Sequence, residues 1–366
     1  MKQACHAALS WRYLIFLLKY TIPLHSNHHV FMKRCLTLAQ KGLGYTYPNP
    51  MVGAVVVKSG NIIGEGWHQK AGTAHAEVHA LSGLHTTDLE GATIYVSLEP
   101  CSHHGKTPPC CDLIIAKGIK KVVVGAKDPN PKVAGNGIKA MQNAGIEVIV
   151  GVLEDSCIEL NKRFYWFHTQ KRPYIILKWA QSADGFIAPE ADVNGSVSWI
   201  SNTHSQQLAH RWRAEEHAIL VGRKTVESDN PKLTTRLWKG NNPIRLVLDP
   251  KLKLDSNAAI FNNTAETIIF NTLKTAQSEN IFWKKVDKEA ILDSLLLKAA
   301  HDDIQSILVE GGAVTLNYFL NANLWNECRG FNSPKHLKGG IKAPNKPNGK
   351  ITGFDVVGDY VQIIKK

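Results

Sequence analysis

Two short stretches of the sequence, HAEVHALSGL at residues 75–84 and LEPCSHHGKTPPC at residues 98–110, contain the residue types that bind a catalytic metal ion. Zinc takes imidazole and thiolate ligands, and a catalytic zinc site supplies three protein ligands and leaves the fourth position to water. His75, Cys101 and Cys110 would form such a set. A structural zinc is the alternative, but three ligands beside a carboxylate fit an open site better.

That carboxylate is Glu77, two residues after His75, at the start of a predicted helix. Zinc lowers the pKa of a bound water to about 7, and a nearby carboxylate can pass the water proton to a leaving amine. The signature of zinc deaminases is H-x-E followed by P-C-x-x-C. Here the second cysteine comes nine positions after the first, which indicates a particular subfamily. Because Cys111 follows Cys110 directly, spacing alone does not decide which of them binds zinc.

Short strands and helices that alternate along the first half of the chain must position these residues. Two β-branched runs around Ser59-Gly60-Asn61 predict a hairpin over residues 51–68. We further predict helices over residues 31–44, 74–84, 110–119 and 135–145 and strands over residues 92–100, 120–126 and 146–152. Strands that alternate with helices indicate a layered α/β fold.

The second half repeats this alternation, and it lacks internal repeats and low-complexity segments. We predict strands over residues 173–180, 217–222, 244–249, 266–271, 305–310 and 359–365 and helices over residues 203–216 and 288–301. A chain of 366 residues is too long for one typical core, so two domains are expected. The expected division is an N-terminal extension over 1–26, a first domain over 27–150, a connector over 151–172 and a second domain over 173–366.

Composition narrows the class of protein. Apolar residues make up 44% and charged residues 20%, as in ordinary globular proteins. The formal net charge of +12 suits nucleic acid or phosphorylated ligands, but the basic residues are spread out, which favours an enzyme with a basic surface. Seven unevenly spaced cysteines favour a reducing cytoplasm. The apolar run YLIFLL at residues 13–18 is too short to span a bilayer, and a mis-assigned start codon is one explanation for the extension.

The stretches YTYPNPMVGAVVV, GEGWHQKAGTAHAEVHAL, YVSLEPCSHHGKTPPC and DPNPKVAGNGI resemble the deaminase half of the bifunctional deaminase-reductases of riboflavin biosynthesis. The resemblance covers nearly all of residues 28–150 and implies a cytidine-deaminase-like three-layer α/β/α domain. It implies that His75, Cys101 and Cys110 bind zinc, that Glu77 shuttles the proton, and that Asn49, His68, His103, Lys106 and Asp128 line the substrate pocket. A lysine in the zinc loop suits a phosphate.

The stretches LKWAQSADGFIA, HAILVGRKTVESDNPKLTTR and LVEGGAVTLNYFL resemble the reductase half of the same family, an α/β domain similar to dihydrofolate reductase. No G-x-G-x-x-G follows a strand, so a Rossmann site is not supported. The glycine pair in ILVEGGAVTLN could bring backbone N–H groups to a phosphate, or could be a tight packing turn. The resemblance implies that NADPH contacts Ala180, Trp199, Thr225, Asp229, Gly312, Ala313, Val314, Thr315, Leu316 and Asn317, and that substrate contacts Arg213, Leu233, Arg236 and Glu310. The two arginines suit a phosphate.

Two features depart from the family pattern. Val197 stands where the family often has serine, so we expect that contact to be lost or taken over by Ser196 or Ser198. The stretch over residues 328–354 lacks a clear apolar strand, and we expect a reduced or irregular last hairpin.

By resemblance, the first domain deaminates 2,5-diamino-6-(5-phosphoribosylamino)pyrimidin-4-one. The second then uses NADPH to reduce the ribosyl arm, which gives 5-amino-6-(5-phosphoribitylamino)uracil. The expected partners are this small substrate and further copies of the chain, with neither nucleic acid nor membrane. Two rival hypotheses remain. One is a zinc deaminase acting on nucleic acid or free nucleosides with an inactive second domain, which would need a basic groove with stacking aromatics. The other is a zinc-stabilised scaffold, in which Glu77 would be dispensable.

Overall fold

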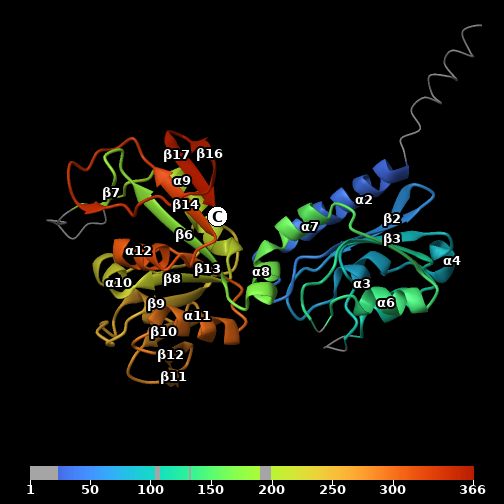
Figure 1. Ribbon diagram of the computed structural model, residues 1–366, viewed down its shortest axis with the longest axis horizontal. Coiled ribbons are helices and arrows are strands. Elements are labelled where there is room, and N and C mark those ends of the chain that lie inside the picture. Colours follow the sequence, from blue (N-terminus) through green and yellow to red (C-terminus); the bar gives the residue numbers. More distant parts are fainter. Residues whose placement is uncertain (1–23, 104–107, 132, 190–198) are drawn as a thin grey trace, which may run out of the picture. The chain divides into compact units, whose positions relative to one another are not determined.

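The computed structural model describes residues 24–103, 108–131, 133–189 and 199–366 (Figure 1). Contacts divide the chain into two compact units. The first contains the described residues up to Gly42 together with Met51–Asn161, and the second contains Leu43–Pro50 together with Lys162–Lys366. The short segment Leu43–Pro50 therefore belongs by its contacts to the second unit, although both of its chain neighbours belong to the first.

The first unit is built on a five-stranded sheet in the order β2-β1-β3-β4-β5. Its strands are β1 (Gly53–Lys58), β2 (Asn61–Trp67), β3 (Thr93–Leu98), β4 (Lys121–Ala126) and β5 (Glu147–Val150). β1 and β2 form the predicted hairpin, and Ser59 and Gly60 at its turn have φ values of 51° and 80°. Positive φ at both turn positions matches the right-handed twist of the strands. β3, β4 and β5 are parallel, so their carboxyl ends share one edge of the sheet.

Helices cover both faces of this sheet, which confirms the three-layer α/β/α prediction for the first domain (Figure 1). One face carries α2 (Leu24–Ala39), which continues into a 3-10 turn (Gln40–Gly42), and α7 (Glu154–Leu160). The other face carries α3 (Ala76–Leu81), α5 (Cys110–Ala116) and α6 (Asn136–Asn143), with the short α4 (Thr86–Leu89) beside them. Buried Ala80, Ile114 and Met141 from this second layer pack on Val56 and Val96 of the sheet.

The second unit is built on a ten-stranded sheet in the order β11-β12-β10-β9-β8-β13-β6-β14-β17-β16. The strands from β12 to β14 in this order are parallel, and β11, β17 and β16 are antiparallel to their neighbours. The parallel strands are β6 (Tyr174–Gln181), β8 (Ala218–Gly222), β9 (Ile244–Leu248), β10 (Thr267–Asn271), β12 (Ile281–Lys285), β13 (Ser306–Val309) and β14 (Glu327–Asn332). The antiparallel strands are β11 (Ala276–Ser278), β16 (Lys350–Val356) and β17 (Asp359–Lys365), and β7 (Phe186–Ala188) and β15 (Ile341–Lys342) form a separate small sheet.

Helices also cover both faces of the large sheet. They are α8 (Lys162–Gln170), α9 (Thr203–Glu215), α10 (Arg223–Asp229), α11 (Ile291–His301) and α12 (Ala313–Asn321), with a 3-10 turn at Ala259–Phe261. Leu295 of α11 and Leu316 and Phe319 of α12 join the main core on one face. Trp212 of α9 packs with Phe331 of β14 in a second cluster. The near-continuous apolar runs of the parallel strands are explained by this two-sided burial.

The C-terminal hairpin is regular, so the prediction of a reduced or irregular one was wrong. Seven residues of β16 pair with seven of β17, from Lys350 opposite Lys365 to Val356 opposite Asp359. β17 in turn pairs with β14 over six residues. The hairpin is also held to α9: the Asn202 amide that begins this helix donates to the carbonyls of Val356 and Val357, at 2.8 and 3.1 Å.

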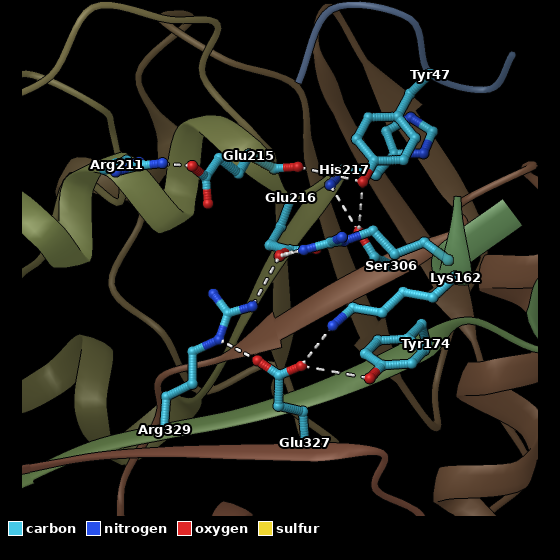
Figure 2. A network of polar contacts seen from close by, with 11 residues as sticks. Tyr47, Lys162, Tyr174, Arg211, Glu215, Glu216, His217, Ser306, Glu327 and Arg329 are labelled. Carbon is cyan, nitrogen blue, oxygen red and sulfur yellow. Dashed lines mark hydrogen bonds and ion pairs between the residues drawn. The ribbon is translucent and has the colours of Figure 1, made fainter. Parts of the chain in front are cut away.

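The sequence did not predict β14, because the charged side chains of Glu327 and Arg329 interrupt its apolar pattern. Both are buried in a polar network (Figure 2), in which Arg329 Nε donates to Glu327 Oε1 at 2.7 Å and Lys162 Nζ donates to Glu327 Oε2 at 2.9 Å. The carboxylate of Glu216 accepts Arg163 Nε at 2.6 Å and lies 3.5 Å from Arg329 Nη2. Buried charges are tolerated when they are paired in this way. The network fixes the start of α8 on the sheet.

The segment Leu43–Pro50 is held in the second unit by the aromatic ring and hydroxyl of Tyr47 (Figure 2). The ring stacks on His217, with centroids 4.6 Å apart and 11° between the planes. The hydroxyl donates to the Glu215 carbonyl at 3.2 Å and lies 3.3 Å from Ser306 Oγ. Burial raises the pKa of the Tyr47 hydroxyl, so it stays protonated at neutral pH.

Candidate active sites

The first unit brings His75, Cys101 and Cys110 together at the carboxyl edge of its parallel strands. Their ligand atoms all lie within 4.8 Å of one another. His75 Nδ1 is 3.3 Å from Cys110 Sγ and 3.6 Å from Cys101 Sγ. A tetrahedral zinc with bonds of about 2.3 Å to sulfur and about 2.0 Å to nitrogen separates its ligands by about 3.5 Å. The three side chains therefore fit a zinc ion, with Nδ1 as the histidine ligand.

Three elements place these ligands. His75 is the residue before α3, Cys101 follows β3 after a two-residue link, and Cys110 is the first residue of α5. The backbone N–H of Cys110 donates to Cys101 Sγ at 3.3 Å. The hydrogen bond from the Cys110 thiol, with His75 as a further cause, lowers the pKa of Cys101 to about 4. The thiol of Cys111 donates to Asp112, and the side chain packs in the core. Cys110, and not its neighbour Cys111, therefore lies with His75 and Cys101.

Glu77 lies in the first turn of α3, and only 3% of its surface is exposed. Burial raises the pKa of its carboxyl, and the nearby Cys101 raises it further. A carboxyl with a raised pKa is suited to taking up and releasing a proton near neutral pH. Glu77 thus lies close to Cys101 and has the burial and the raised pKa that suit proton transfer.

Of the residues predicted to line the deaminase pocket, His68 lies beside His75 and His103 is exposed. The His68 ring lies edge-on to His75 with centroids 5.2 Å apart, and its Nδ1 lies 3.1 Å from the carbonyl of Ala74. Burial lowers the pKa of His68 and favours its neutral form. His103 is exposed on the loop after Cys101. Lys106 lies outside the described residues.

Asn49 and Asp128 complete the predicted set. Asn49 belongs to the segment Leu43–Pro50, and its backbone N–H donates to the carbonyl of Thr46 at 2.7 Å. Asp128 follows β4 and is 9% exposed, and burial raises the pKa of its carboxyl to about 6. Its Oδ1 accepts the backbone N–H of Asn130 at 2.7 Å.

Sequence reasoning missed Glu99, which organises this edge of the sheet. Its buried carboxylate accepts four backbone N–H groups, from Asp128, Gly135, Gly137 and Ile138, at 2.9 to 3.3 Å. A carboxylate at the first turn of α6 also complements the helix dipole. Glu99 therefore holds the loop that carries Asp128 against the strand end that leads to Cys101. The partners are distant in sequence, so only its place in the E-P-C triplet could have drawn attention to it.

The second unit gathers a cluster of charges where β13 and β6 end. Arg213 of α9 donates two hydrogen bonds to Glu310, from Nε to Oε1 at 2.8 Å and from Nη2 to Oε2 at 2.7 Å. Lys178 of β6 lies 3.5 Å from the same carboxylate. Burial alone would raise the pKa of Glu310, but Arg213 and Lys178 hold it at about 2. Arg236 is exposed nearby, and burial and the charge of Arg213 lower its pKa.

Lys178 was not predicted from sequence. The signal was its position as the one charged residue within the apolar run YIILKWA. Burial lowers the pKa of its ammonium group and Glu310 opposes that shift. Leu233, predicted as a substrate residue, buries its side chain in the core, so its main chain is the part that could meet a ligand.

The predicted NADPH residues surround a close contact between two strand ends. A Cβ built on Gly311 would lie 2.5 Å from Val221 Cα, and one on Gly222 would lie 2.4 Å from Thr315 Oγ1. Only glycine fits such approaches. A Cβ on Gly312 would lie 3.1 Å from Thr225 Oγ1. The glycine turn thus brings the N-terminus of α12 beside the N-terminus of α10. Helix N-termini carry free backbone N–H groups, which can bind a phosphate.

The remaining predicted cofactor residues belong to several elements of the second unit. Ala180 is half-buried on β6, Asp229 is exposed at the end of α10, and Trp199 is 54% exposed with its carbonyl accepting from Lys335 Nζ at 2.9 Å. On α12, Ala313 and Asn317 are half-buried, Val314 is 73% exposed and Leu316 is buried in the core. Val197, Ser196 and Ser198 lie outside the described residues.

Two family profiles match the chain. Residues 25–126 match the cytidine and deoxycytidylate deaminase zinc-binding region. Residues 173–350 match the RibD C-terminal domain. None of the described helices has both the length and the apolar character that crossing a membrane requires.

Curated relatives match along most of the chain. The riboflavin biosynthesis protein RibD of Aquifex aeolicus is 45% identical over 317 residues, which cover 85% of this chain and 88% of the relative. The protein of the same name from Escherichia coli is 38% identical over 329 residues, covering 84% and 88%.

Two solved structures are similar over 93% of this chain and 99% of their own. One is a diaminohydroxyphosphoribosylaminopyrimidine deaminase/5-amino-6-(5-phosphoribosylamino)uracil reductase from Thermotoga maritima, with 39% identity and a TM-score of 0.82. The other is Acinetobacter baumannii RibD, with 33% identity and a TM-score of 0.84.

Proposed function

The chain belongs to the RibD family of riboflavin biosynthesis proteins, and on that premise we propose which of its residues carry out the two reactions. It is a zinc-dependent deaminase and an NADPH-dependent reductase. We assign deamination to residues 27–150 and reduction to residues 173–366, joined by the connector 151–172. The observation that carries the assignment is the cluster of His75, Cys101 and Cys110 with one buried carboxyl group beside it.

In the deaminase, His75, Cys101 and Cys110 would hold the zinc ion, which would supply an activated water for hydrolysis of the pyrimidine amine. Glu77 would take up a proton at its carboxylate and deliver it to the departing amine. Its burial supports this role, because a raised pKa lets the same group accept and release a proton.

The side chains beside the zinc ligands would bind and orient the pyrimidine ring. We assign this work to the side chains of Asn49, His68, His103, Lys106 and Asp128. The neutral state of His68 supports a hydrogen-bonding role, since burial lowers its pKa. The shift in Asp128, whose pKa is raised to about 6, lets its carboxyl act as donor or acceptor near neutral pH.

In the reductase, NADPH supplies a hydride for the ribosyl arm of the deaminated product. We assign its binding to the glycine turn and helix α12, that is Gly312 to Asn317, together with Ala180, Trp199, Thr225 and Asp229. Arg213, Arg236, Glu310 and the main chain at Leu233 bind the substrate, and we add Lys178 to this set. The charges favour a phosphorylated ligand: Lys178, Arg213 and Arg236 outnumber Glu310 three to one, a net charge of +2.

We further propose that the chain works in the cytoplasm, forms a homo-oligomer and binds neither nucleic acid nor membrane. β16 supports self-association, because it is an edge strand with exposed Ile351 and Phe354. Exposed edge strands with apolar side chains tend to pair with another chain. Light scattering in solution tests this, and a monomeric mass at micromolar concentration would contradict it.

Product analysis by mass spectrometry tests the two activities. Purified protein is incubated with the diaminopyrimidinone substrate, with and without NADPH. We expect the deaminated compound alone without NADPH and the deaminated, reduced compound with it. Glu77→Gln should lower ammonia release by about a hundredfold or more, the usual contribution of a general acid–base group, and leave NADPH oxidation on deaminated substrate unchanged. Loss of both reactions in this variant would contradict separate sites.

A further inference from the structure

His210 is a buried histidine of α9 that the assignment above does not use. Only 3% of its surface is exposed, and its Nδ1 has no hydrogen-bond partner within the described part of the chain. Leaving a buried polar atom unpaired is energetically costly, and native proteins seldom do so without a reason. A ligand that enters the site is one source of the missing partner.

The surroundings of His210 are those of the reductase pocket. It lies three residues before Arg213 on α9, so the two side chains share one face of the helix. Arg213 is bound to Glu310, which lies 3.5 Å from Lys178. After burial, the charges of Arg213 and Arg236 have the largest effects on the imidazole, followed by Glu310 and Lys178. His210 is therefore close to all four charged groups assigned to the substrate.

The charge state of His210 limits what it can bind. Burial, then the positive charges of Arg213 and Arg236, lower its pKa to about 4. The imidazole is therefore neutral at physiological pH, with one nitrogen that donates and one that accepts. The cations around it are the suitable partners for a phosphate, whereas a neutral imidazole suits a hydroxyl group, which also donates and accepts.

We propose that His210 is a substrate-binding residue of the reductase site and that its Nδ1 hydrogen-bonds to a hydroxyl group of the ribosyl arm. This inference rests on the proposed reductase function and adds a contact to it. A phosphoribosyl arm would then be held at two chemically different places, its phosphate by cations and its sugar by a neutral ring. An arm without sugar hydroxyls would lose the second contact.

Steady-state kinetics of NADPH oxidation with deaminated substrate test the contact. We expect His210→Ala to raise the KM for the pyrimidine about twofold to tenfold, the effect of one hydrogen bond. The dissociation constant for NADPH and the rate of deamination should not change, and His210→Gln should recover part of the affinity. His204→Ala, an exposed histidine of the same helix, is the matched control and should behave like the wild type. An unchanged KM in a less stable His210→Ala protein would mean that the ring only packs, and would overturn the proposal.

A measurement on the unmutated chain covers the case in which His210→Ala does not fold. In protein labelled with ¹⁵N-histidine, the His210 signal is identified by its absence in His210→Gln. Ribose 5-phosphate should shift this signal, and inorganic phosphate should shift it less; equal shifts, or none, would contradict the sugar contact. The proposed function fails separately, if the wild-type chain oxidises no NADPH with deaminated substrate.

Discussion

The carboxylate of Glu99 accepts the backbone N–H of Gly137 at 3.1 Å and so joins the end of β3 to the first turn of α6. The two backbones are closer still at the next residue: a Cβ built on Gly137 would lie 2.1 Å from the carbonyl oxygen of Pro100. Pro100 directly precedes Cys101, one of the three proposed zinc ligands. The packing of α6 therefore sets the position of one side of the metal cluster.

Gly137→Ala should destabilise the first unit. In an exposed helix, alanine in place of glycine stabilises by about 1 kcal/mol, but here the added methyl group meets backbone that cannot move independently of Cys101. Overpacking of this kind costs about 1–3 kcal/mol, so the net change in the free energy of unfolding should be a loss. Urea denaturation measures it, and Lys139→Ala in the same helix is the control. A gain in stability would show that the loop around Pro100 relaxes freely.

Cys101→Ser and Cys110→Ser should lose zinc, and Cys111→Ser should keep it. The first two thiols lie with His75 Nδ1, whereas the third points at Asp112. Metal analysis of the purified variants gives zinc per chain, and ammonia release gives the activity. A chelator should abolish deamination of the wild type and leave reduction of deaminated substrate unchanged. Zinc loss in Cys111→Ser equal to that in Cys110→Ser would reverse the assignment of the two neighbours.

Arg213→Lys should impair reduction only. Lysine cannot reproduce the paired hydrogen bonds from Nε and Nη2 to Glu310, nor the one from Nη1 to the carbonyl of Thr234. A hydrogen bond to a charged group contributes about 1.5–3 kcal/mol, so kcat/KM for reduction should fall about tenfold to a hundredfold. Arg211→Lys is the control, because Arg211 makes an exposed pair with Glu215 on the same helix. If Arg213→Lys lowered the rate of deamination as much as the rate of reduction, the change would have damaged the protein generally.

The second unit should lose stability in acid because of two buried carboxylates. Burial opposes ionisation of Glu327 and Glu310, but neighbouring cations hold the pKa of each at about 2, against 4.5 for an ordinary glutamate. Between these values the unfolded chain binds more protons than the folded one. The stabilisation is therefore complete above about pH 4.5 and disappears as the pH falls toward 2, by an amount of order 3 kcal/mol for each group.

Thermal unfolding at a series of pH values checks this dependence. Glu327→Gln should lower stability at neutral pH, since Lys162 and Arg329 lose their partner, and should flatten the acid slope. A slope identical to that of the wild type would show that Glu327 is not the titrating group.

The features that the sequence predicted correctly are those set by residues close together along the chain. The hairpin at Ser59 and Gly60 and the alternation of strands and helices depend on short-range patterns. The types of His75 and Cys101 pointed to a metal site, whereas the choice of Cys110 over Cys111 came from the family resemblance. Periodicity failed at β14, where Glu327 and Arg329 look like surface residues. Their partners lie on α8 and at the end of α9, more than a hundred residues away, so no local pattern could reveal that they are buried.

The same reason explains the site residues that were missed. Glu99 and Lys178 each follow or interrupt an apolar run, and His210 lies among the polar residues of a helix. The partners that distinguish these three residues are brought to them by the fold. The expectation of an irregular C-terminal hairpin had a different cause. β16 is exposed along almost its whole length, so it carries too few apolar residues to resemble a strand.

The terminal strand β17 is paired with β14 on one side and β16 on the other, and Asp359 at its start accepts the backbone N–H of Asn202 at 2.8 Å. Asn202 begins the helix that carries His210 and Arg213. A stop codon at Asp359 would delete none of the residues assigned to zinc, cofactor or substrate. It would nevertheless remove the strand that pairs with buried β14 and the carboxylate that accepts the backbone N–H of Asn202 at the start of α9. A truncated gene of this kind would still encode every sequence motif, but its product would lack the reductase activity. The C-terminal residues of gene models in this family should therefore be checked as carefully as the motifs.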